Sequence, residues 1–134
     1  MPVARPVSGR TARRLLLAAA VCAGLAAIGA CAVLVSIDRG VRGYAGDAQR
    51  LHPHPGDDGA ALLALLADES RSFRERNHAV WALGRRREAR ALPALQAAYH
   101  GGPCDHERAL CQRELAKAIR RCGAEPAAPA LARP

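Results

Sequence analysis

Residues 15–37 read LLLAAAVCAGLAAIGACAVLVSI, a run of 23 residues without a charged side chain. A helix rises about 1.5 Å per residue, so this run would span roughly 35 Å, enough to cross a hydrocarbon core about 30 Å thick. A helix is expected inside a bilayer because it satisfies the backbone hydrogen bonds within the segment. The run therefore predicts a transmembrane helix or signal anchor over residues 15–37.

The sequence leaves two fates open for this segment. Residues 15–30 fit the apolar region of a cleavable signal peptide. The four residues from Ile28 to Cys31 resemble the box at which bacterial lipoproteins are cut, which implies an exported lipoprotein acylated at Cys31. The residues after Cys31 stay apolar as far as Ile37, however, and this continuation favours an uncleaved anchor.

The flanking charge predicts how the anchor is oriented. The basic flank, residues 1–14, has no acidic residue and supplies half of the net charge of +8 through Arg5, Arg10, Arg13 and Arg14. Only Arg39 and Arg42 closely follow the span. Because arginines beside a span tend to stay in the cytoplasm, we expect a single-pass inner-membrane protein with a cytoplasmic N-terminus and a periplasmic helical domain.

Residues 38–56 are predicted to form a flexible tether. Glycines recur at 40, 43 and 46, and the stretch ends in His52-Pro53-His54-Pro55-Gly56. Glycine and proline disfavour both helix and strand, so an extended connector is expected. The tail, residues 124–134, is predicted to be disordered.

Residues 57–123 have helical periodicity with short breaks, which predicts a helical domain. A first helix is expected over residues 58–67, after an aspartate cap. Ser72 and Glu75 have the spacing of a capping box at the start of a second helix, and Pro93 suits the first turn of a third.

A fourth helix is expected to begin at Asp105 and to end at Gly123, which can adopt the left-handed conformation typical of a helix exit. Its apolar positions recur at helical spacing and predict one buried stripe, formed by Cys111, Leu115, Ala118, Ile119 and Cys122.

The segments Arg76–Gly84 and Arg90–Leu95 carry a family resemblance. The first ends in Ala-Val-Trp-Ala-Leu-Gly and the second contains Ala-Leu-Pro-Ala-Leu, a pairing similar to the HEAT-like repeats of bacterial proteins and relatives of bilin lyases. The chain departs from that pattern at residues 87–89, where Arg-Glu-Ala replaces the usual Gly-Asp-Pro. The resemblance implies an all-α fold, a short HEAT-like helical-hairpin domain of about four helices.

The cysteines and histidines between residues 100 and 111 leave three alternatives open. Cys104 and Cys111 could form a disulfide in the periplasm, or remain thiols packed as small apolar groups. Together with His100 and His106 they are also of zinc-ligand type, but their spacing matches no strong zinc signature. We predict no metal site and no cofactor.

Two further features have a functional and a structural interpretation. Trp81 could anchor a partner, but its place in an apolar stripe favours core packing. Arg85, Arg86 and Arg87 could form an interaction surface for an acidic partner, or could satisfy the last carbonyls of a helix.

No constellation of catalytic residues appears, so the sequence predicts a binding module and not an enzyme. The expected function is a membrane-tethered protein–protein interaction or scaffold module with a protein partner in the envelope, and self-association into a homo-oligomer would also help a thin core. Nucleic-acid binding is not expected, because much of the basic charge flanks the span. The alternative from the repeat resemblance is a bilin-lyase-like enzyme or accessory.

Overall fold

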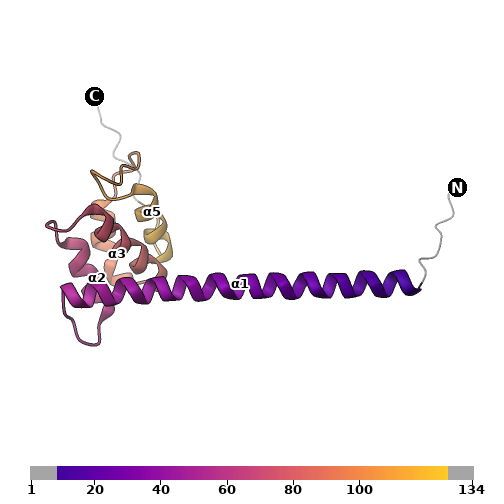
Figure 1. The fold of residues 1–134 in the computed structure, drawn as a ribbon. Helices are drawn as coiled ribbons and strands as arrows, with labels where there is room; N and C mark the ends of the chain where they lie inside the picture. The colour runs from indigo at the N-terminus through magenta and orange to yellow at the C-terminus, as the bar shows by residue number, and fades with distance from the viewer. Residues whose placement is uncertain (1–8, 127–134) are drawn as a thin grey trace, which may run out of the picture. The chain divides into compact units, whose positions relative to one another are not determined.

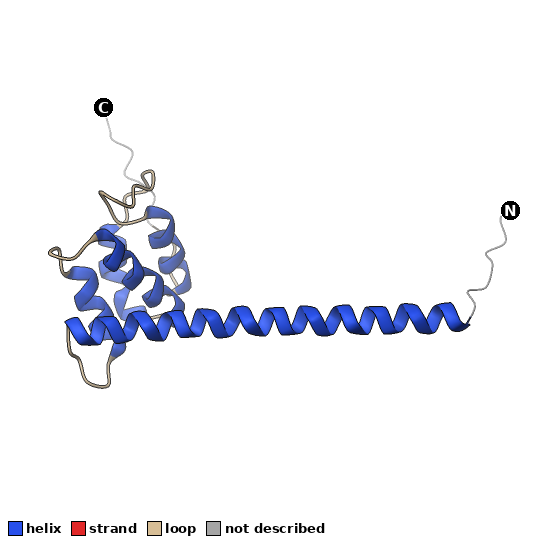
Figure 2. Ribbon diagram, in the orientation of Figure 1, coloured by secondary structure: helices blue, strands red, loops and turns tan. Residues whose placement is uncertain are grey.

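The structure, a computed structural model, describes residues 9–126, and every regular element in that range is helical (Figure 2). The predicted all-α class is therefore confirmed for the described residues. The chain divides into two compact units, Met1–Asp38 and Arg39–Pro134. Residues 1–8 of the basic flank and residues 127–134 of the predicted tail lie outside the described residues.

The first unit contains the N-terminal part of helix α1 (Gly9–Leu51). This helix is long and apolar enough to span a membrane, by length and composition, and its most apolar stretch has no buried residue. Its large apolar side chains are exposed, among them Leu15, Leu16, Leu17, Val21, Leu25, Ile28, Val33, Leu34 and Val35.

The predicted tether over residues 38–56 is wrong for most of its length, because α1 continues to Leu51. Val41, Ala45 and Ala48 follow one another at helical spacing, and all three side chains are buried. A helical glycine costs about 1 kcal/mol relative to alanine, and burial of this apolar stripe offsets that cost. Only the short segment after Leu51 is a loop.

The second unit gathers four further α-helices beside the last turns of α1 (Figure 1). Helix α3 packs against both α2 and α5, and α4 packs against α5. A single core joins the elements, and its largest fully buried side chains are those of Leu62, Leu83, Leu95, Leu115, Ile119 and Val80. The elements are α2 (Asp58–Ala67), α3 (Phe73–Arg86), the 3-10 turn η1 (Ala89–Ala91), α4 (Leu92–Ala98) and α5 (Gln112–Arg121).

The predicted starts of α2 and α3 are confirmed. Asp57 caps α2 by accepting a hydrogen bond from the amide of Ala60 at 2.9 Å. Ser72 and Glu75 form the complete capping box at the start of α3. Side-chain caps of this kind satisfy amides that have no partner within the helix.

The predicted start of the fourth helix is wrong. Helix α5 begins at Gln112, whereas the carboxylate of Asp105 accepts the amides of Glu107 and Arg108 at 3.1 and 3.2 Å in an isolated turn. An aspartate can make such local bonds in place of capping a helix. The predicted stripe is nevertheless buried, and Gly123 has the expected left-handed conformation, with φ of +97°.

Helices α3 and α5 are in close contact at Gly84. A Cβ atom at this position would lie 2.7 Å from the backbone Cα of Ala118, a distance that packed carbon atoms do not adopt. The close approach therefore requires glycine on α3 and a small residue on α5.

Candidate functional site

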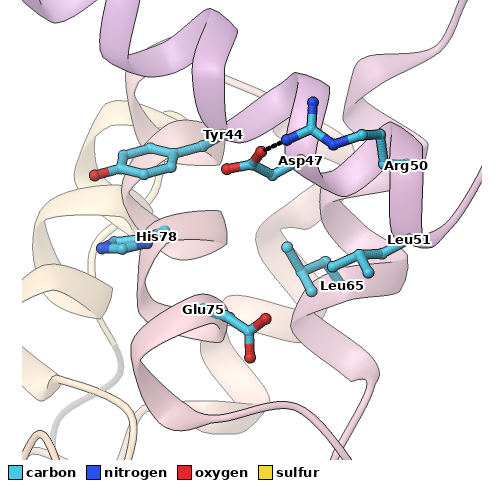
Figure 3. Close-up of a pocket in the computed structure, with 7 residues that line it drawn as sticks. All are labelled: Tyr44, Asp47, Arg50, Leu51, Leu65, Glu75 and His78. Carbon is cyan, nitrogen blue, oxygen red and sulfur yellow. Dashed lines mark hydrogen bonds and ion pairs between the residues drawn. The ribbon is translucent and has the colours of Figure 1, made fainter.

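A cleft of about 250 Å³ opens between the last turns of α1 and helices α2 and α3 (Figure 3). Figure 3 shows Tyr44 and His78 on one side of it, with Leu51 and Leu65 on the other. We call this site the α1–α3 cleft; it is lined by Tyr44, Asp47, Arg50, Leu51, Leu65, Glu75 and His78.

The aromatic wall of the cleft is a stack of two rings. The centroids of Tyr44 and His78 lie 4.2 Å apart with planes inclined by 16°, and Trp81 meets the tyrosine ring edge-on at 5.7 Å. Partial burial lowers the pKa of His78, and the charge of Arg74 lowers it further. The imidazole is therefore neutral at neutral pH, which suits a ring stacked on another ring.

The acidic groups of the cleft already have partners. Asp47 is paired with Arg50, one turn along α1. Glu75 accepts hydrogen bonds from the amide and hydroxyl of Ser72, at 3.0 and 2.8 Å, and these bonds lower the pKa of Glu75. Carboxylates held in the charged form are poor general bases at neutral pH.

The structure brings the predicted disulfide partners together. The Sγ atoms of Cys104 and Cys111 lie 3.0 Å apart, and both residues are free thiols. Cys104 is half-buried, whereas Cys111 is buried at the start of α5. The two thiols are thus in reach of each other but differ in their access to solvent.

The zinc-type residues are not brought together. Within residues 9–126, no group of three or more histidine, cysteine, aspartate or glutamate side chains could hold a metal ion. His106 lines a separate cavity with Arg74 and Asn77, and the amide of His100 is bonded to the side chain of Gln112 at 2.8 Å.

The three consecutive arginines have different surroundings. The guanidinium of Arg85 lies over the ring of Trp81, 5.5 Å from its centroid, and Arg86 pairs with Asp58 at 3.3 Å. Arg87 ends α3 in the left-handed conformation, and its amide bonds to the carbonyls of the preceding turn. All three side chains are exposed, and their role as an interaction surface stays a prediction.

Two other predicted positions lie in different units. Trp81 is half-buried against the core, as its place in the apolar stripe indicated. Cys31 is exposed on the apolar part of α1, and its acylation stays a prediction.

Sequence reasoning missed the α1–α3 cleft because residues 38–51 were expected to be extended. A signal was present: Val41, Tyr44, Ala48 and Leu51 recur at intervals of three or four, the spacing of one helix face. The buried Gln112 was also missed. No apolar pattern predicts its burial, because it is a polar residue at the start of a helix, where polar residues are usually exposed.

Comparison with protein-family models, with curated proteins and with solved structures finds no match to this chain.

Proposed function

We propose that this protein is a membrane-anchored interaction module without catalytic activity. Residues 15–37 form the anchor, and a HEAT-like helical domain lies on the periplasmic side of the inner membrane. The observation that carries the proposal is the double use of α1, whose apolar part is fully exposed while Val41, Ala45 and Ala48 belong to the core of the second unit. One continuous helix would therefore serve both as the membrane anchor and as part of the domain that binds the partner.

The α1–α3 cleft is the proposed binding site for a segment of an envelope protein. Leu51 and Leu65 offer an apolar wall, and the stacked rings of Tyr44 and His78 face it (Figure 3). Concave sites with apolar walls and a few fixed polar groups are typical binding sites. The carboxylate of Glu75 favours a partner segment with an apolar side chain next to a lysine or arginine.

Site-specific photo-crosslinking tests the cleft. A benzophenone side chain at Leu51, in native membranes, is expected to give a discrete adduct with an envelope protein. The same group at the exposed Gln96 of α4 is the matched control and should give none. An identical adduct from both positions would contradict the cleft, and an adduct with the mass of two copies of this chain would identify self-association.

A charge variant sharpens the experiment. Glu75→Gln preserves the capping box, since glutamine also serves at that position, but removes one of the two carboxylate charges that line the cleft. The adduct at Leu51 should fall several-fold. An unchanged yield would show that the partner does not use this charge.

The orientation is tested by labelling with a membrane-impermeant maleimide in a Cys22→Ala, Cys31→Ala background. Cys104 is half-buried and reachable, so we expect labelling in intact spheroplasts after reduction. Labelling that requires lysis of the inner membrane would place the helical domain in the cytoplasm and overturn the proposed location.

A further inference from the structure

The Cys104 and Cys111 thiols lie where the segment after α4 meets the start of α5. Their Sγ atoms are 3.0 Å apart, within reach of a covalent bond after a small movement. Cys104 lines a cavity of about 260 Å³ together with Tyr99, Gly101 and Arg113. Cys111 is only 3% exposed, so one thiol faces a cavity and the other lies behind it.

The start of α5 distinguishes the two thiols electrostatically. The amide of Arg113, in the first turn of the helix, donates to Sγ of Cys104 at 3.4 Å. Free amides and the helix dipole favour a negative charge at that end. A hydrogen bond from the Cys111 thiol, followed by the Arg113 amide, lowers the pKa of Cys104, while burial chiefly raises that of Cys111.

We propose that Cys104 and Cys111 form a thiol–disulfide exchange site, with Cys104 as the attacking thiolate and Cys111 as the resolving thiol. The arrangement is more than a fixed crosslink because the half-buried Cys104 lines a cavity in which a second disulfide can dock. The inference is independent of the α1–α3 cleft and of the membrane orientation.

The exchange balances with a disulfide as the co-reactant. The Cys104 thiolate attacks one sulfur of the substrate disulfide, forming a mixed disulfide and expelling one substrate thiolate. Cys111 then loses its proton to that thiolate or to solvent and attacks Sγ of Cys104. The Cys104–Cys111 disulfide forms, the second substrate thiolate leaves, and the substrate is reduced to two thiols while this chain is oxidised.

The cavity favours a small anionic disulfide of the glutathione type. Arg113 supplies a positive charge at its edge, Gly101 has no side chain to obstruct a ligand, and none of its lining residues, all in the described part of the chain, is acidic. A carboxylate-bearing disulfide therefore matches the charge of the cavity.

The test uses the full chain with Cys22→Ala and Cys31→Ala, reduced and then treated with oxidised glutathione, with intact mass as the readout. The parent protein should lose two hydrogens, forming the internal disulfide. The Cys111→Ser variant should stop as a stable glutathione adduct at Cys104. The Cys104→Ser variant should form an adduct at Cys111 roughly ten-fold more slowly or not at all.

The buried Cys122 reports folding in each variant, since it should react only after unfolding. Two further measurements need no variant at the pair. Limiting alkylation of the reduced parent protein should modify Cys104 in preference to Cys111. In a separate sample, reduced glutathione should return the folded, oxidised parent protein to the dithiol. Equal reactivity of the two thiols, or a disulfide that resists reduction until the chain is denatured, would overturn the proposal in favour of a structural crosslink.

Discussion

At the scale of single residues, Gly84 sets how closely α3 and α5 can pack. We expect Gly84→Ala to lower the free energy of unfolding by about 1–3 kcal/mol, since its Cβ would meet the Ala118 backbone. Gly43 is the matched control: it is helical and exposed, with nothing within 4 Å of an added Cβ. Gly43→Ala should stabilise by about 0.5–1 kcal/mol.

Urea unfolding of the full chain in detergent, followed by far-ultraviolet circular dichroism, measures both glycine variants. The packing argument would be refuted if Gly84→Ala were as stable as the parent protein.

Gln112 is the residue that holds the segment before α5. Its side-chain oxygen accepts the amides of His100 and Gly101, and its Nε2 donates to the carbonyl of Leu110 at 3.1 Å. Gln112→Leu would leave those groups without partners, at a cost of about 1–3 kcal/mol. Hydrogen exchange at the His100 and Gly101 amides should accelerate, whereas Gln96→Ala on the exposed face of α4 should change nothing.

At the scale of elements, an ion-pair network joins the start of α2 to η1. The guanidinium of Arg90 contacts Asp57 at 2.8 and 2.9 Å and Glu88 at 2.8 Å. The hydrogen bond from Arg90 is the largest cause that lowers the pKa of both carboxyl groups. Both acids therefore favour the folded state when charged, and the network is sensitive to acid.

The sign of the pH effect follows from these lowered pKa values. The stabilisation is complete above the unfolded pKa of about 4 and is lost as the pH falls towards the folded values. The thermal midpoint of Arg90→Gln should lie below that of the parent protein at pH 7, and the gap should close below about pH 4. The exposed Arg120→Gln serves as control, and a gap that stays constant with pH would refute the network.

The elements also show what the sequence could predict. The bounds of α2 and the Ser72 capping box were predictable because they depend on a few adjacent residues. The extension of α1 to Leu51 had a signal in the apolar spacing of residues 41–51, but the glycines and prolines of residues 38–56 pointed the other way. The burial that outweighs the cost of those glycines comes only from the assembled core. The predicted start of α5 was wrong because the Asp105 carboxylate can accept backbone amides in an isolated turn as readily as at the start of a helix.

Of the two candidate sites, one could be predicted from the sequence and the other could not. The pairing of Cys104 with Cys111 could be anticipated from a short separation in sequence. The α1–α3 cleft could not, because Tyr44 and Glu75 are 31 positions apart in sequence and come together only when α1 packs against α3.

At the scale of the whole molecule, the second unit should fold without the apolar segment but not without the end of α1. A chain of residues 39–134 should unfold cooperatively in urea. A chain of residues 52–134 lacks Val41, Ala45 and Ala48 and should lose cooperative unfolding, because a domain of this size has only about 5–15 kcal/mol of total stability. Equal stability of the two chains would show that α1 adds nothing to the core.

The continuity of α1 also constrains how the protein is made. Val41, Ala45 and Ala48 leave the ribosome soon after the apolar segment, yet α3, which contacts this part of α1 through His78 and Trp81, is synthesised later. The nascent chain must therefore carry an uncovered apolar stripe while the rest of the domain follows. A holding chaperone that binds the uncovered stripe would have its greatest effect at that stage of biogenesis.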